Sequence, residues 1–103
     1  MDIIGLNIPD RYFKLHAGDT GIKAAQKSFS AWHLITDDAE WSAPQQVQAA
    51  HPKASILKAG RVVFNVKGND FRLICKVDYA SLIVSIRWFG THAEYDKVDA
   101  ETV

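Results

Sequence analysis

Cysteine is almost absent from this sequence, and the absence narrows the possibilities. A single cysteine, Cys75, among 103 residues excludes an intramolecular disulfide framework and any zinc site built from several cysteines. A chain this short without disulfides fits a reducing compartment. No apolar run approaches the roughly 20 residues of a membrane span, and residues 1–9 do not resemble a signal peptide. We therefore expect a cytoplasmic protein with no membrane partner.

Net charge is absent as well. Twelve Lys and Arg residues balance twelve Asp and Glu residues, which taken alone argues against a basic nucleic-acid-binding protein. The balance hides a segregation. Residues 53–97 hold eight bases and four acids, a net charge of +4, whereas residues 1–52 and 98–103 each carry a net charge of −2. A chain that is neutral as a whole can thus present one basic surface.

Size and composition are those of one globular domain. The chain is 48% hydrophobic and 23% charged, close to the average of folded proteins. Its length suits one domain with one core, and it contains no internal repeat, low-complexity tract or linker. We therefore expect a single domain that covers residues 1–103.

The first half of the chain predicts three helices. Before them, the apolar residues 3–8 predict a short strand, either at a sheet edge or leading into a helix. Pro9 fits the first turn of a helix that ends near Leu15. A short third helix is predicted within residues 42–51, with Ser42 as its candidate cap.

The second helix has the clearest periodicity. We expect Asp19 or Thr20 to cap it and the pair Asp37–Asp38 to end it. Apolar residues three or four positions apart define its expected buried face: Ile22, Ala25, Phe29, Trp32 and Ile35.

Beyond residue 52 the pattern changes to the alternation of strands. Strands are predicted at residues 61–67, 71–77 and 82–89, the last ended by Gly90, with short turns between them. Three strands joined in this way make an antiparallel meander. Because the helices precede the strands, we predict an α+β domain in which N-terminal helices pack on one face of a small antiparallel sheet. Residues 91–103 are expected to form one helical turn and then fray.

Side chains two apart on a strand share a face, and the two faces of this sheet differ. One face is apolar, includes Trp88, and should pack under the helices. The other face, which would include Phe89, carries cations and amides but no carboxylate. Such a face is normally just solvated, but this composition also fits RNA. Its polar members are Asn65, Lys67, Arg72, Lys76 and Arg87.

The segment after the last predicted strand concentrates chemically capable side chains. Histidine is the residue type that most often acts as a general acid or base, so His92 is a candidate for either role. Tyr95 and Lys97 offer further proton donors or a stacking surface for a base. An ordinary polar terminus is the alternative. The remaining His and Asp residues are too scattered for a metal site, so we expect no metal or cofactor, and Cys75 should be buried and a poor nucleophile.

Two segments together resemble one family, the HigB toxins. They are VVFNVKGNDFRL at residues 62–73 and IRWFGTHAEYDK at residues 86–97. The resemblance extends over nearly the whole chain and includes Trp32, Trp41 and Pro44. HigB toxins are RelE-like mRNA interferases, so the resemblance implies a RelE-like fold and cleavage of translated mRNA in the ribosomal A site. It also implies a HigA-like helix-turn-helix antitoxin and contact with operator DNA only through the toxin–antitoxin complex.

Under this resemblance the candidate residues acquire roles. Metal-free RNA cleavage by the substrate 2′-OH needs a base, cations near the phosphorane and an acid. Arg72 matches the arginine that RelE-like enzymes place after an aromatic residue, and it would stabilise the phosphate. His92 would act as acid or base, Tyr95 would stack on a base or assist proton transfer, and Lys97 is a second acid or electrostatic candidate. The residues expected to position RNA are Asn65, Lys67, Asn69, Lys76 and Arg87.

Alternatives remain open at the level of sequence. The chain lacks the full RelE-type lysine pair on the first hairpin strand, which bears on the individual roles more than on the reaction class. Arg87 could be buried and held by Glu94 or Asp96 instead of facing RNA. A non-catalytic RNA- or ribosome-binding module would use the same basic sheet, and a degenerate toxin would keep only its antitoxin-binding surface.

Overall fold

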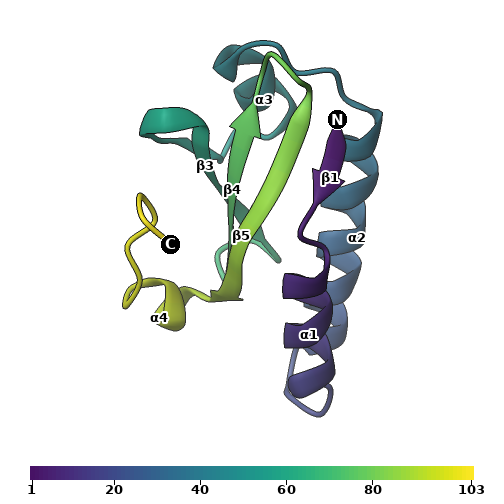
Figure 1. Cartoon of the computed structure of the whole chain (residues 1–103). Coiled ribbons are helices and arrows are strands. Elements are labelled where there is room, and N and C mark those ends of the chain that lie inside the picture. The colour runs from purple at the N-terminus through teal and green to yellow at the C-terminus, as the bar shows by residue number, and fades with distance from the viewer.

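The computed structural model describes all 103 residues and consists of one sheet flanked by helices (Figure 1). No helix combines the length and apolar character needed to cross a membrane. The elements in chain order are β1 (Asp2–Ile4), α1 (Asn7–Leu15), α2 (Ile22–Asp38), α3 (Pro44–Ala50), β2 (Ser55–Ile56), the 3₁₀ turn η1 (Lys58–Gly60), β3 (Arg61–Val66), β4 (Phe71–Asp78), β5 (Ile83–Thr91) and α4 (His92–Tyr95).

The sheet has five strands in the order β1-β5-β4-β3-β2. Its centre is the predicted antiparallel meander β3-β4-β5, and the predicted α+β class is confirmed. The sheet is mixed, however, because β1 runs parallel to β5 at one edge. The other edge is β2, a strand that the sequence did not predict and that pairs only two residues with β3.

Helices α1 and α2 cover one face of the sheet, as Figure 1 shows. The buried residues of α2 are spaced three, four, three and four positions apart: Ile22, Ala25, Phe29, Trp32 and Thr36. The prediction that Ile35 is the last residue of the buried face is wrong, since its side chain is 47% exposed. The alternating repeat requires a step of four after Trp32, which brings Thr36 to the sheet.

The predicted helix caps are wrong. Neither Asp19 nor Thr20 caps α2, which begins after Gly21 at a φ of 83° with no side-chain cap. Ser42 does not cap α3, whose N-cap is Ala43. The left-handed backbone before α2 suits glycine, which has no side chain that could cap the helix.

Strand β5 carries a β-bulge that the alternation did not reveal. Ile74 pairs with Trp88, but the next residue of β4, Cys75, pairs with Ile86. Arg87 is therefore the extra residue without a partner on β4. An extra residue shifts every later side chain of the strand to the opposite face.

The shift corrects the predicted faces at the end of β5. Phe89, expected on the basic face, belongs to the core and is 4% exposed. Trp88, expected in the core, lies outside the core cluster and packs near Tyr95. Gly90 does not end the strand, which continues to Thr91.

The C-terminal segment covers part of the face that should have been solvated. In Figure 1 it lies on the side of the sheet opposite α1 and α2. Arg61 donates hydrogen bonds from Nη1 to the backbone oxygens of Ala100 and Val103. On this same face Val63 and Ile74 are only 3% and 0% exposed. The predicted helical turn is present as α4, but the fraying predicted after it is wrong, because Arg61 holds the end of the segment. The open part of the basic face is therefore narrower than expected.

Candidate active site

Arg72 stands at the start of β4, where the turn between β3 and β4 holds its guanidinium. Nη1 donates to the carbonyl oxygens of Asn69 at 3.0 Å and of Phe71 at 3.1 Å. The guanidinium carbon lies 5.8 Å from the centre of the Tyr95 ring, within the range of a cation–π contact. Nε and Nη2 keep N–H groups that these bonds do not use. Arg72 is thus fixed in position and still able to bind an anion.

His92 begins α4 next to the same turn. Its backbone N–H donates to the carbonyl oxygen of Asp70 at 2.9 Å. Its side chain is 50% exposed, and Nδ1 lies 3.2 Å from Oδ2 of Asp96. A carboxylate at Nδ1 favours the tautomer with its proton there, which leaves Nε2 as the proton acceptor. The structure therefore brings the predicted residues His92, Arg72 and Tyr95 to one end of the sheet.

A hydrogen-bonded anchor that the sequence analysis missed holds α4 in place. Glu94 and Thr91 form a capping box, in which each side chain accepts from the backbone N–H of the other. Tyr12 of α1 adds a third bond, since its O–H donates to Oε1 of Glu94 at 2.7 Å. The Thr-x-x-Glu spacing was a readable signal for the capping box. No local pattern could have pointed to Tyr12.

The surroundings of this anchor shift the pKa of both partners. Tyr12 stacks on His16 with ring centres 4.1 Å apart and meets Phe89 edge-on at 5.2 Å. Burial and then the carboxylate of Glu94 raise the pKa of the Tyr12 hydroxyl well above its usual value. Burial also tends to raise the pKa of Glu94, but the hydrogen bonds from Thr91 and Tyr12 outweigh it, and the net pKa is lowered. The pair is therefore a neutral phenol on a carboxylate.

The predicted RNA-positioning amides adjoin Arg72. Asn65 lies opposite Arg72 in the pairing of β3 with β4. Its Nδ2 donates to Oδ1 of Asn69 at 3.4 Å, and the carbonyl of Asn69 accepts from Arg72. Asn65, Asn69 and Arg72 thus form one continuous polar edge.

Lys67 does not belong to this edge. Strand β3 ends at Val66, and Lys67 follows in the turn with a φ of 53°, so strand alternation does not apply to it. Its Nζ pairs with Asp70 at 3.1 Å, and a Cβ on Gly21 would meet it at 2.6 Å. The backbone N–H of Lys67 donates to Ser28 of α2. The prediction that Lys67 shares a face with Asn65 is wrong, because its ammonium lies beside the loop before α2.

The remaining predicted cations form no hydrogen bond or salt bridge with this group. Lys76 lies four residues along β4 from Arg72, about 13 Å away at strand spacing. Arg87 is exposed on the bulge. Its proposed acidic partners are engaged elsewhere, Glu94 by Tyr12 and Asp96 by His92, so the buried alternative for Arg87 is wrong. Lys97 is exposed and its side chain contacts neither Arg72 nor His92 through a hydrogen bond.

Two further observations bear on chemistry. No group of three or more His, Cys, Asp or Glu side chains is arranged to hold a metal ion. Cys75 is fully buried, as predicted, and burial raises the pKa of its thiol well above the usual value. A buried thiol with a raised pKa is a poor nucleophile.

Comparison with known families identifies the chain. A search of the curated proteins returned no match. The family model of the HigB toxin, described as the RelE-like toxic component of a toxin-antitoxin system, matches residues 25–98. This segment includes Arg72, His92 and Tyr95 and leaves out α1 with Tyr12. A toxic component of such a system implies an antitoxin partner. The chain therefore belongs to the HigB toxin family.

Proposed function

We propose that this toxin is a ribosome-dependent endoribonuclease that cleaves translated mRNA without a metal. Residues 1–103 form its single catalytic domain, which acts in the cytoplasm. A HigA-like helix-turn-helix antitoxin neutralises it, and operator DNA is bound only through that complex. Membership of the HigB family supports the toxin class.

One observation carries the nuclease proposal. Arg72, Tyr95 and His92 come from β4 and α4, and the turn between β3 and β4 joins them through hydrogen bonds to Asn69 and Asp70. The fixed cation and the imidazole paired with a carboxylate are groups that cleavage at a phosphodiester uses, and the half-buried ring of Tyr95 beside them can support a base.

The chemistry follows from what each group can do. Nε2 of His92 accepts the proton of the substrate 2′-OH, and the 2′-oxygen attacks the adjacent phosphorus. The free N–H groups of Arg72 bind the phosphorane oxygens, where negative charge develops. The bond to the 5′-oxygen breaks, and Lys97 or a water supplies its proton. The products are a 2′,3′-cyclic phosphate and a 5′-hydroxyl. Tyr95 supports a base by stacking.

Electrostatics support dependence on the ribosome. Binding of nucleic acid in bulk draws on many cation–phosphate contacts. The chain as a whole has no net charge. The two neighbours of Arg72 in the polar edge, Asn65 and Asn69, are neutral. The cations Lys76 and Arg87 lie further along the sheet. Weak affinity for free RNA is therefore expected, and the ribosome presents the strand.

Induction of the toxin in a bacterial host tests the proposal. Wild type should arrest growth, and primer extension on a co-expressed mRNA should reveal cleavage within its translated part. Loss of an acid–base group lowers the reaction rate about 10²–10⁴-fold, and loss of a hydrogen-bond donor to the transition state lowers it about 10²–10³-fold. His92→Ala and Arg72→Ala should therefore abolish detectable cleavage. Lys27→Ala, on an exposed part of α2, is the control that keeps activity. Growth arrest with intact mRNA would refute the nuclease and favour a non-catalytic ribosome-binding module.

A further inference from the structure

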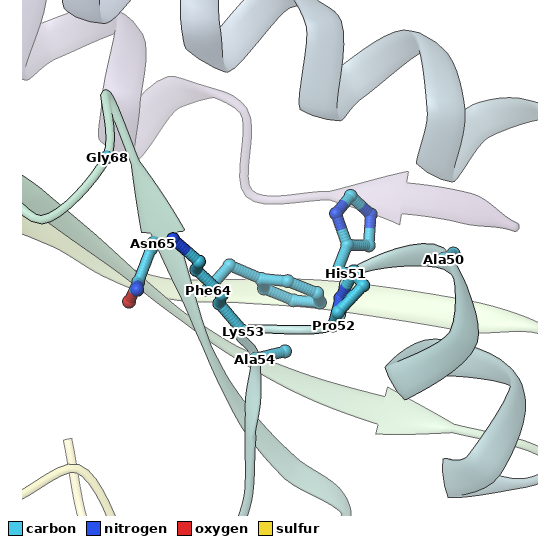
Figure 2. Close-up of a pocket in the computed structure, with 8 residues that line it drawn as sticks. All are labelled: Ala50, His51, Pro52, Lys53, Ala54, Phe64, Asn65 and Gly68. Carbon is cyan, nitrogen blue, oxygen red and sulfur yellow. The ribbon is translucent and has the colours of Figure 1, made fainter.

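An open pocket of about 320 Å³ lies beside the part of β3 that β2 does not pair with. Strand β2 pairs only with Val62 and Val63, so the following residues of β3 have an unpaired edge. Figure 2 shows the pocket at this edge, between β3 and the loop after α3. It is formed by residues 50–54, by Phe64 and Asn65, and by Gly68 of the turn. No part of the proposed cleavage chemistry uses it.

The lining combines flat apolar walls with a few polar groups. Pro52, Phe64 and two alanines are apolar, whereas His51, Lys53 and Asn65 are polar, and no carboxylate is present. Lys53 forms no salt bridge. The volume lies at the small end of the roughly 300–1,000 Å³ range of ligand pockets. A single base with its phosphate fits this size and this polarity, because bases combine apolar faces with hydrogen-bonding edges.

The His51 side chain lies at the inner side of this pocket. Its imidazole meets Phe64 at 5.0 Å and Trp41 at 5.7 Å between ring centres, both edge-on. Nε2 is buried and has no hydrogen-bond partner. Figure 2 shows the ring directed away from Asn65. These aromatic contacts hold the ring against the core, so His51 closes the pocket on its inner side without offering Nε2 to a ligand.

The pocket is continuous with the candidate active site. Asn65 lines it and donates to Asn69, whose carbonyl accepts from Arg72. Across the strand pair, the Cα atoms of Asn65 and Arg72 are about 5 Å apart. An RNA strand whose phosphate binds Arg72 would therefore bring a neighbouring base to the pocket.

We propose that this pocket binds one base of single-stranded mRNA next to the phosphate held by Arg72. Pro52 contacts the face of the base, Asn65 contacts its edge, and Lys53 binds the attached phosphate. The inference rests on the proposed function, since the same strand occupies both places. It adds a determinant of base preference at the cleavage position.

An NMR titration of the full-length His92→Ala chain tests binding without cleavage. The probes are an RNA trinucleotide and the same trinucleotide with an abasic central ribose. The intact probe should shift the amide signals of residues 50–54, 64, 65 and 68, and the abasic probe should leave them in place. Lys53→Ala and Asn65→Ala should each weaken binding about fivefold, as expected for one hydrogen bond or ion pair. Lys58→Ala is the exposed control with unchanged affinity. Equal shifts with both probes, or none at these residues, would overturn the inference.

Mapping of cleavage positions separates the two proposals. If wild type does not cut mRNA, the proposed function fails, but the titration still decides whether the pocket takes a base. If wild type cuts, Asn65→Ala and Pro52→Ala should alter the base frequencies beside the cut, with thermal melting as the check on folding. An unchanged pattern in both variants overturns the base pocket. Unchanged frequencies together with weaker neutralisation by a co-expressed antitoxin would assign the pocket to protein binding instead.

Discussion

The hydrogen bond between Tyr12 and Glu94 joins residues 82 positions apart and connects α1 to the helix that carries His92. Tyr12→Phe removes the donor and keeps the ring and its packing. The bond is to a carboxylate, which strengthens it, but it lies at the surface, which weakens it. We expect a loss of about 1 kcal/mol in the free energy of unfolding, or about 5 °C in Tm for a domain of this size.

The pH dependence of this loss has a definite sign. The pKa of Glu94 is lowered from 4.5 in the folded protein, so its contribution is present above pH 4.5 and is lost as the pH falls through the lower folded value. The pKa of Tyr12 is raised from 10.0, so its contribution is complete below pH 10 and is lost as the pH rises above it. The stability difference between wild type and Tyr12→Phe should be constant near neutrality and shrink at both extremes.

Urea unfolding of both proteins at a series of pH values measures this difference. Tyr79→Phe is a matched control, because the Tyr79 hydroxyl is buried without a hydrogen-bond partner. Removing an unsatisfied hydroxyl should cost nothing or stabilise the fold slightly. If both variants lose the same stability, or if the Tyr12→Phe difference does not change between pH 3 and pH 11, the assigned role of the Tyr12–Glu94 bond is incorrect.

Two further substitutions test the packing around the site. In Gly90→Ala, the new Cβ would come within 2.6 Å of Cη2 of Trp88, so we expect a destabilisation of about 1–3 kcal/mol by urea unfolding; a loss below about 0.5 kcal/mol would contradict this packing. Arg61→Ala removes the hydrogen bonds that hold the C-terminal segment, and faster amide hydrogen exchange is expected in residues 96–103. Lys58→Ala, on the neighbouring turn, should leave that exchange unchanged, and equal rates in all three proteins would show that Arg61 does not retain the segment.

The sequence predicted those parts of the fold that depend on local patterns. The meander follows from alternation and turn residues, and α2 follows from its apolar repeat. Strand β2 pairs only two residues, too few to produce a pattern, and the parallel pairing of β1 with β5 joins opposite ends of the chain. The bulge at Arg87 depends on the register against β4, which no periodicity within β5 contains. Local sequence patterns therefore could not predict the non-local pairing of strands.

The candidate site, like the fold, could be predicted from the sequence only in part. Residue type and position after a strand pointed to Arg72, His92 and Tyr95, but their proximity depends on how α4 folds back beside the turn. Lys67 was assigned to the wrong face because a strand end was misplaced by one residue. The contact of Tyr12 with Glu94 required the tertiary structure, since α1 carries no polar motif that indicates a partner.

The bulge in β5 divides this strand into two halves with separate phases. Before Arg87, the inward side chains Val84 and Ile86 belong to the core, and after it the core position falls on Phe89. Deletion of Arg87 would leave Trp88 alone between Ile86 and Phe89, so plain alternation would still turn Trp88 outward and Phe89 inward. The two aromatic rings would exchange faces only if β5 kept Arg87 and paired it with β4, because regular alternation from Ile86 would then turn Trp88 inward and Phe89 outward. The unpaired state of Arg87, and not the nature of its side chain, therefore decides which aromatic ring supports the core and which one faces Tyr95.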